Sequence, residues 1–532
     1  PVMRQLLAVE IKAREILHKA DPRKPVIGQD AGNFNDAIHI THYVGFMPIQ
    51  EFIESDSYWL RNGVKPYMIT EQSAPWVTDW TTGARKGHNS PDRYSNVAER
   101  AAMTKGDAAF HRSDVDQEDL TQFEKRFQLN RARDPKSRSG MQPPFGVLYA
   151  YQRRPEMPSF YKTINYERTR EEWLNWRAEG LGLLCDWDNT MVGKEQAVKE
   201  AWAPVTGYIA GTPSCRTDKT HILRPGEVWE RQFLVMNNRR SPAKTECKWT
   251  AAINGKEMGA GSVKAEIACG GQTSIPIKLN MPSTDVDASG ILSVKLFEDG
   301  KEIASDKMDF QVMAVIKAPA LSGSVALIDP EGASADALDK CGIKYQRLQF
   351  NADLSKYNVV VFGRKAFSYE PAILGRQLDL PALLAAGKKM LILEQEEDIL
   401  RNRFNFRTEY VSPRSIFVRI ADHPVTRGLP DSVLNFWRGA STLTKGYEEA
   451  FSQKAEPEMN GARRFVNWND GKEHPRQMKW GNSHNVATVI IEKPGRGNFR
   501  TIADCEFNLD YAAILEFEQA PGRILFCQAD VS

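Results

Sequence analysis

The sequence predicts a multidomain protein in which two α/β regions flank one all-β region. Short apolar segments alternate with helical segments up to about residue 204 and again after about residue 320. Between them, polar and apolar side chains alternate, and turns interrupt the pattern about every 8–12 residues. The chain has 532 residues, enough for about three domains. We therefore place the domains at 1–204, 205–318 and 319–532.

Composition excludes several classes of protein. The chain is 41% hydrophobic and 26% charged, which is typical of a folded globular protein. Its 70 Lys and Arg nearly balance its 68 Asp and Glu, so the basic surface of a nucleic-acid-binding protein is not expected. No apolar run approaches the ~18 residues of a membrane helix. We expect neither nucleic acid nor a membrane as partner.

The cysteines indicate neither a metal site nor a disulfide framework. The chain has seven of them, with no CxxC pair and no Cys/His spacing that suits zinc. Cys247 and Cys269 could pair within one β-domain. We favour the interpretation that both are small hydrophobic residues.

The first region, 1–204, predicts β/α units. The expected strands are Val26–Gly28, Ile38–Val44, Tyr67–Thr70 and Gly182–Leu184, and the expected helices are 3–19, 49–62, about 96–111 and 169–179. Only about four units are visible, whereas a closed β/α barrel has eight. The region is therefore either a small open sheet or half of a barrel.

The second region, 205–318, predicts an antiparallel β-sandwich of the immunoglobulin-like kind. The expected strands are Glu227–Val235, Glu246–Ile253, Gly261–Ala268, Thr273–Leu279 and Ile291–Glu298. The turns between strands are expected at Asn254-Gly255, Cys269-Gly270-Gly271 and Asp299-Gly300. No residue pattern in this region suggests catalysis.

The third region, 319–532, predicts an open doubly wound α/β sheet. The expected strands are Val325–Ile328, Val359–Phe362, Met390–Leu393 and Arg523–Gln528, with helices at Ser334–Lys340 and Leu380–Ala386. No GxGxxG follows the first strand and no GxxxxGK[ST] occurs, so nucleotide binding has little support.

Candidate site residues gather where the strands of the first region end. Glu71 follows Tyr67–Thr70, and His42 and Tyr43 end the preceding strand. The other candidates follow nearby strands, namely Asp30, Trp76, Asp186 and Trp187. In β/α barrels the active site lies at the carboxyl ends of the strands. Carboxylates for chemistry and aromatic faces for stacking suit a sugar substrate.

The first region resembles a known enzyme family. The succession DPRKPV, HITHYVGF, KPYMITEQS and WRAEGLGLLCDW looks like strands five to eight of a clan A glycoside hydrolase barrel, most similar to family 2 enzymes of the β-galactosidase and β-glucuronidase type. The resemblance implies that Glu71 is the nucleophile. It also implies that Tyr43 hydrogen-bonds the nucleophile and that Trp187 forms the floor of the sugar subsite.

The sequence departs from that family in one respect. A retaining glycosidase uses a second carboxyl group as acid/base, which in this family is the Glu of an Asn-Glu pair ending the fourth strand. No Asn-Glu pair occurs in residues 1–190. Because residues 3–19 look like the helix that follows that strand, we expect the acid/base in a part of the polypeptide that precedes Pro1.

The order of the later regions agrees with the resemblance. A β-sandwich followed by a domain similar to class I glutamine amidotransferases occurs beside several barrel glycosidases, and the segment His423–Pro430 resembles one in that amidotransferase-like group. The strand-to-helix segment Val359–Ala366 contains no Cys, so amidotransferase activity is not expected. We interpret the third region as a module for packing or oligomerisation.

The sequence thus predicts a retaining glycoside hydrolase for a β-linked sugar in an oligosaccharide or polysaccharide, secreted or periplasmic, with no metal or other cofactor. Structural interpretations compete with each assignment, because Glu71 could be a surface residue and His42 and Trp187 could belong to a core. Two alternatives stay open: a non-catalytic carbohydrate-binding or scaffold protein, and one subunit of a split enzyme.

Overall fold

A computed structural model describes most of the chain outside the segments 73–158 and 437–485. The described residues are 2–27, 36–42, 50, 53, 60, 66–72, 159–180, 183–184, 194–314, 321, 323–410, 416–418, 420–429, 431–436, 486–487, 489–494, 497–505 and 508–531. They form a mixed α/β protein with several separate sheets, and no closed barrel occurs among them. They divide into two compact units, which meet in sequence between Met313 and Ala314.

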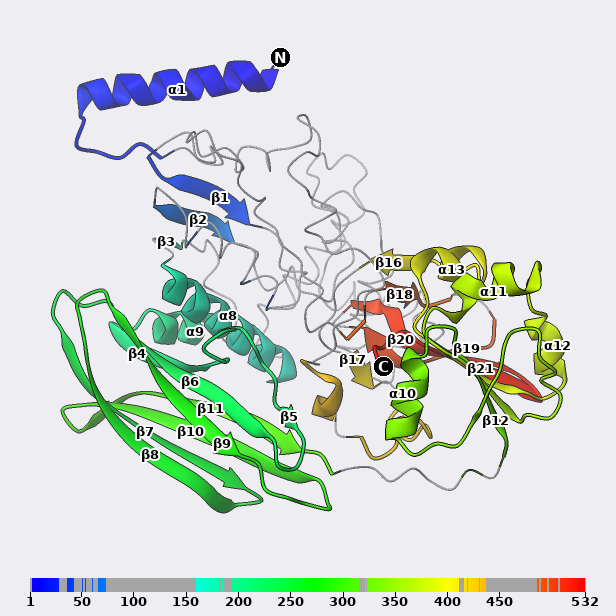
Figure 1. Ribbon diagram of the computed structural model, residues 1–532. Coiled ribbons are helices and arrows are strands. Elements are labelled where there is room, and N and C mark those ends of the chain that lie inside the picture. Colours follow the sequence, from blue (N-terminus) through cyan, green and yellow to red (C-terminus); the bar gives the residue numbers. More distant parts are fainter. Residues whose placement is uncertain are drawn as a thin grey trace, which may run out of the picture. The chain divides into compact units, whose positions relative to one another are not determined.

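The first unit begins with β/α elements (Figure 1). Helix α1 (Val2–Ala20) precedes strands β1 (Ile38–His42) and β2 (Tyr67–Gln72), and helix α8 (Ser159–Glu179) leads to β3 (Leu183–Leu184) and α9 (Lys194–Ala201). The three strands form one parallel sheet in the order β1-β2-β3. Sequential parallel strands with a helix between β2 and β3 are the arrangement of a β/α unit.

The predicted strand at Val26–Gly28 is wrong for its described residues, because Val26 and Ile27 have no regular secondary structure. Asp36 explains the difference. Its carboxylate accepts the Val26 N–H (2.7 Å), and its own N–H donates to the Val26 carbonyl (3.0 Å). The backbone of Val26 therefore satisfies its hydrogen bonds in a local loop rather than in a ladder.

The same carboxylate holds α1. Arg14 donates to Asp36 Oδ1 at 2.7 Å, and His18 Nε2 lies 2.6 Å from Asp36 Oδ2. Partial burial raises the pKa of Asp36, but the hydrogen bonds from Val26, Arg14 and His18 outweigh it and lower that pKa to about 2. The ionised carboxylate of Asp36, which lies just before β1, thus joins helix α1 to the loop at Val26.

The second part of this unit is a two-layer β-sandwich. One sheet has the order β5-β11-β10-β7-β8 and the other has the order β4-β6-β9. The strands are β4 (Val205–Ala210), β5 (Ile222–Leu223), β6 (Val228–Asn237), β7 (Ala243–Ile253), β8 (Lys256–Ile267), β9 (Gln272–Asn280), β10 (Ala288–Glu298) and β11 (Lys301–Val312). All five predicted strands form, and β4, β5 and β11 are additional.

Side chains from both sheets fill the sandwich. Phe233, Leu292 and Phe310 are among the fully buried core residues, and the Trp229 and Phe310 rings are 4.8 Å apart. The hairpin turns occur where expected: Asn254 and Gly255 have φ of 47° and 77°, and Asp299 and Gly300 have φ of 50° and 78°. Positive φ at both central residues is typical of a type I′ turn, which matches the twist of the joined strands.

The second unit is built on one large sheet. Its order is β13-β12-β14-β15-β21-β20-β18-β16, with β17 joined through β19 to β20, and neighbours from β13 to β21 are parallel. Bounds are β12 (Val325–Ile328), β13 (Gln346–Arg347), β14 (Val359–Phe362), β15 (Lys389–Leu393), β16 (Thr408–Tyr410), β17 (Ile416–Val418), β18 (Val489–Glu492), β19 (Phe499–Cys505), β20 (Asn508–Gln519) and β21 (Gly522–Cys527). The predicted parallel strands all form within a residue or two.

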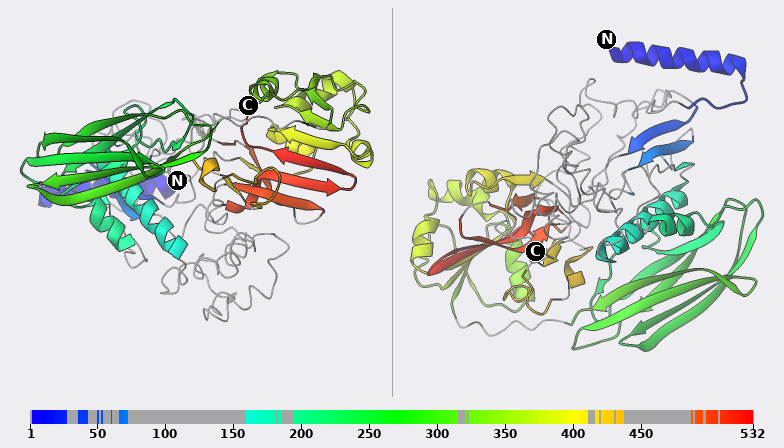
Figure 2. Two further views of the ribbon diagram at one scale, coloured as in Figure 1. Left: turned by 90° about the horizontal axis from the view of Figure 1, so that it is seen from below. Right: turned by 180° about the vertical axis from the view of Figure 1, so that it is seen from behind.

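Helices lie beside this sheet (Figure 2). The helices are α10 (Ala333–Lys340), α11 (Ala366–Leu374), α12 (Leu380–Ala385), α13 (Glu397–Asn402) and the 3-10 turn η4 (Asp431–Leu434). Buried Phe362 and Phe367 have ring centroids 4.7 Å apart, and Phe404 packs edge-on against Phe526 at 5.2 Å. Parallel strands alternate with helices along this part of the chain, so the predicted α/β character of the region is confirmed.

Candidate functional site

The candidate active site lies at the carboxyl ends of the parallel strands β1 and β2. Glu71 is the penultimate residue of β2, where it pairs with Thr41, and Gln72 pairs with His42. The pairing shifts by one residue between Ile40 and Thr41, so a β-bulge occurs beside Glu71. Bulges next to active sites re-aim strand ends.

The structure brings together two of the seven predicted site residues. Glu71 and His42 lie on adjacent strands, with their backbones offset by one register position. The others lie outside the described residues: Tyr43, Asp30, Trp76, Asp186 and Trp187. Tyr43 directly follows the described end of β1, and Asp186 and Trp187 follow β3.

The middle of β2 is firmly packed. Tyr67 and Ile69 are buried, and Met68 and Ile69 pair with Leu183 and Leu184 of β3. The candidate nucleophile therefore lies near the end of a strand that pairs with a neighbouring strand on each side. A reacting group on a rigid element is more precisely placed than one on a loop.

Helix α8 connects β3 to its surroundings. The indole N–H of Trp176, which is fully buried, donates to the Ile53 carbonyl at 3.3 Å. Arg177 donates through Nη1 to the carbonyls of Ala201 and Ala203, at 2.5 and 2.8 Å. Burial lowers the pKa of Arg177 to about 10. These contacts hold helix α8, which leads to strand β3.

The β-sandwich holds α8 from the other side, and Figures 1 and 2 show α8 and α9 lying along it. The Tyr208 hydroxyl donates to Asn175 Oδ1 at 2.9 Å, in a buried contact. Ion pairs join the loop before β5 to the same helix, namely Arg216 with Glu179 and Lys219 with Glu171. The sandwich thus contributes to the position of β3 through α8.

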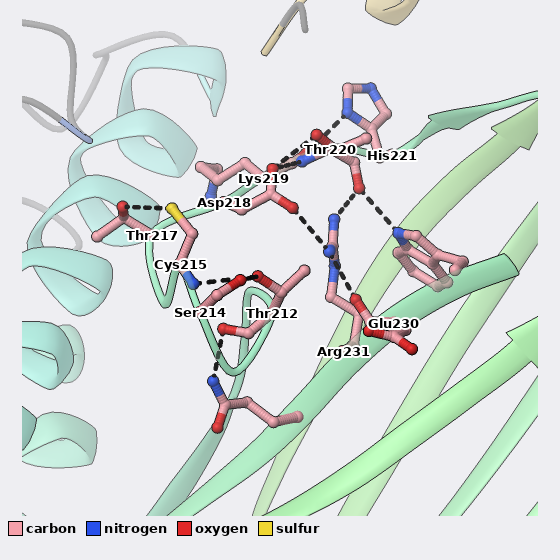
Figure 3. A network of polar contacts seen from close by, with 12 residues as sticks. Thr212, Ser214, Cys215, Thr217, Asp218, Lys219, Thr220, His221, Glu230 and Arg231 are labelled. Carbon is pink, nitrogen blue, oxygen red and sulfur yellow. Dashed lines mark hydrogen bonds and ion pairs between the residues drawn. The ribbon is translucent and has the colours of Figure 1, made fainter. Parts of the chain in front are cut away.

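That loop is in turn anchored by Arg231 of β6, which is 2% exposed (Figure 3). Its guanidinium donates to Asp218 Oδ2 at 3.0 Å, to the Glu230 carbonyl at 2.8 Å and to the Thr220 carbonyl. It also lies over the Trp229 ring, 4.7 Å from the centroid. Burial raises the pKa of Asp218, but Arg231 and Thr220 outweigh this and lower it.

Sequence reasoning missed these positioning residues. Arg231 had a visible signal, since in the strand VWERQFLV its position alternates with the apolar Trp229 and Phe233, so a charged residue shares their face. Trp176 and Tyr208 had none, because their partners are far away in the sequence. Among the described residues, no group of three or more His, Cys, Asp or Glu could hold a metal ion.

The second unit has a strand-to-helix turn at the carboxyl edge of its sheet. The backbone N–H groups of this turn already have hydrogen-bond acceptors within the protein. Lys365 has φ of 55° between β14 and α11. Backbone N–H groups of this turn donate within the protein: Arg364 to Ser334 Oγ (2.8 Å), Lys365 to the Glu394 carbonyl (3.0 Å) and Phe367 to Gln395 Oε1 (3.1 Å). A nucleophile elbow instead offers such N–H groups to an oxyanion.

Comparisons with known proteins give no family. No family model matches the chain, and no curated protein matches it. None of the described helices is both long and apolar enough to cross a membrane.

Similar solved structures cover only parts of the chain. The CARDB domain of the PF1109 protein from Pyrococcus furiosus is 13% identical, with a TM-score of 0.16 over 20% of this chain and 87% of that one. Red sea bream transglutaminase is 9% identical, with a TM-score of 0.19 over 27% and 22%. The α-2-macroglobulin of E. coli is 15% identical, with a TM-score of 0.16 over 22% and 7%. Likenesses this weak identify neither a relative nor an activity.

Proposed function

We propose that the chain carries the nucleophile of a retaining glycoside hydrolase that acts on a β-linked sugar, of the β-galactosidase type. One observation supports the proposal most. Glu71 stands at the carboxyl end of the central strand in a parallel sheet whose strands follow in sequence order, with α8 between β2 and β3. Chemistry in β/α proteins occurs at this edge.

In the proposed reaction, a Glu71 carboxylate oxygen attacks the anomeric carbon and forms a glycosyl-enzyme. The bond to the leaving oxygen breaks as a second carboxylic acid gives that oxygen its proton. Water then attacks the same carbon, the second carboxylate takes its proton, and Glu71 is released. The two carboxyl groups of retaining enzymes lie about 5–5.5 Å apart. We assign the second group to no residue in 1–190, where no Asn-Glu pair occurs.

The remaining assignments belong to this proposal as well. Tyr43 would donate a hydrogen bond to the nucleophile, and Trp187 would stack on the sugar ring. His42, Asp30, Asp186 and Trp76 would bind sugar hydroxyls or the rest of the substrate. The second unit would serve as an amidotransferase-like packing or oligomerisation module, and a polysaccharide substrate favours a secreted or periplasmic protein.

The test is hydrolysis of an aryl β-galactoside by the full protein as its source produces it. Glu71→Gln removes the nucleophile while keeping the size of the side chain, and we expect kcat to fall about a thousandfold or more. Glu15→Gln is the matched control, because Glu15 is an exposed carboxylate on α1 that pairs only with Lys12 among the described residues. Its kcat should stay unchanged.

The outcomes separate the glycosidase from a non-catalytic binding protein. Loss of turnover in Glu71→Gln alone supports the glycosidase. Sugar binding without turnover in both the unaltered protein and the variant favours a non-catalytic binding protein. Turnover that is unaffected by Glu71→Gln contradicts the proposed role of this residue.

A further inference from the structure

A groove of about 750 Å³ lies between α8, α9 and β11 in the first unit. This volume is within the usual range of small-molecule sites, roughly 300–1,000 Å³. Polar side chains from all three elements and from β4 line it, among them Tyr166, Arg170, Gln196, Glu200, Thr206 and Ser305. None of these elements carries a residue assigned to the proposed catalytic site.

Arg170 forms the fixed base of the groove. Its Nε donates to Glu200 Oε2 at 3.0 Å and its Nη1 donates to Asp306 Oδ1 at 3.2 Å. The Tyr166 hydroxyl donates to the same Glu200 oxygen at 2.5 Å, and Asp306 Oδ2 accepts the Ile209 N–H at 2.7 Å. The Arg170 side chain is 15% exposed. These contacts hold the polar groups in one arrangement before any ligand arrives, which reduces the entropy cost of binding.

The network leaves a donor and an acceptor available. Arg170 Nη2 has no hydrogen-bond partner among the residues that the structure describes, and it is not among the buried unsatisfied atoms there. Gln196 donates its Nε2 to Glu200 Oε1 at 2.9 Å, which leaves its amide oxygen as an acceptor. Glu200 therefore orients both side chains.

The charges of the lining disfavour an anion. Three carboxylates line the groove, Glu195, Glu200 and Glu302, against two cations, Arg170 and Lys199. Lys199 is engaged with Glu195 at 2.6 Å, and Arg170 already pairs with two carboxylates. A ligand therefore meets oriented hydrogen-bonding groups rather than an unpaired charge.

We propose that this groove is a second saccharide-binding site, which takes neutral hexose units of an oligosaccharide. Neighbouring sugar hydroxyls are both donors and acceptors, so they match the Arg170 Nη2 group and the Gln196 amide oxygen. The hydroxyls of Thr206 and Ser305 add further partners in the lining. The inference rests on the proposed function only for the saccharide class of the ligand.

The test is hydrogen exchange of the full protein carrying Glu71→Gln, with and without neutral β-1,4-galactotetraose. We expect the sugar to slow exchange in peptides from α9 and β11. Ser305→Trp places an indole in the groove at an exposed strand position. About ten times more tetraose should then be needed for the same protection. Lys307→Trp is the control, because it adds the same ring at another exposed position of β11 outside the groove lining.

Equal protection in Ser305→Trp and Lys307→Trp, or no protection in α9 and β11, would overturn the proposal. Protection by a sulfated galactan but not by the neutral tetraose would overturn it too. Aryl galactoside turnover is measured separately in proteins that keep Glu71. Turnover without groove protection defeats only this inference, whereas protection without turnover defeats only the proposed activity.

Discussion

Arg231 allows the sharpest test of how the sandwich is held together. We consider Arg231→Met, which keeps much of the aliphatic volume but removes the guanidinium. The change removes the bond to Asp218 and the bonds to the Glu230 and Thr220 carbonyls. Asp218 keeps its bonds from Thr220, at 2.9 and 2.6 Å, but loses its guanidinium partner.

The expected loss in the free energy of unfolding follows from these lost contacts. Removing one partner of a buried ion pair typically costs about 3–5 kcal/mol, because the other charge is left uncompensated. Arg231 is 1% and Asp218 17% exposed at the side chain, so solvent screens this pair little. We therefore expect the free energy of unfolding of the sandwich to fall by about 4 kcal/mol. Asp218→Asn in the same protein should restore part of it, because the orphaned charge is then absent.

The assay is urea unfolding followed by tryptophan fluorescence, with Trp229 next to the altered side chain. Arg239→Met is the control, since Arg239 also loses a carboxylate partner, Glu298 at 2.6 and 2.7 Å, but is 38% exposed. Exposed pairs contribute about 0–1 kcal/mol. If Arg231→Met costs no more than Arg239→Met, the buried network does not stabilise the sandwich as argued.

Three further predictions concern other parts of the chain. Asp36→Asn should speed hydrogen exchange across α1. Because the folded pKa of Asp36 is lowered to about 2, the unaltered protein should keep α1 protected above the ordinary carboxyl pKa and lose that protection as the pH falls through about 2. Unchanged exchange in the variant would show that Asp36 does not hold the helix. Gly290→Ala should destabilise the sandwich by about 1–3 kcal/mol in urea unfolding, since its Cβ would lie 2.2 Å from the Phe310 ring. Gly259→Ala, with 3.5 Å to the nearest side-chain atom, is the tolerated control, and equal effects would contradict the packing. Burial raises the pKa of the Cys247 and Cys527 thiols to about 12 and about 11, whereas Cys269 and Cys341 are exposed. Iodoacetamide at pH 8 with peptide mapping should therefore label the exposed pair first and the buried pair only in urea, and early labelling of Cys247 would contradict its burial.

The sequence was sufficient to locate five strands of the sandwich and the four parallel strands β12, β14, β15 and β21 of the second unit, whereas β13 and β16 to β20 were not predicted. Val325–Ile328 and Val359–Phe362 were predicted to the residue, because short apolar runs between helical segments are typical of buried parallel strands. Helix α8 begins ten residues before its predicted start at 169, and β11 was not predicted although the Asp299-Gly300 turn before it was.

The candidate site was predictable only as a strand end. Glu71 could be placed after an apolar strand, and the structure extends that strand through Gln72. The contacts that hold its neighbours could not be foreseen, because Arg170 and Asp306 are 136 residues apart and Trp176 and Ile53 are 123 apart. Such pairs arise only when separate elements pack. The strand predicted at Val26 was wrong because a side chain, that of Asp36 ten residues later, accepts the Val26 N–H in place of a neighbouring strand.

The most direct measurement is covalent trapping of the nucleophile. An activated 2-deoxy-2-fluoro-β-galactoside slows the release of a glycosyl-enzyme, so the intermediate can be seen by intact mass and located by peptide mapping. We expect one added fluorosugar per chain, on the peptide that contains Glu71, and none on Glu71→Gln. A label on a different carboxylate would contradict the central claim, as would no label on a protein that hydrolyses the parent galactoside.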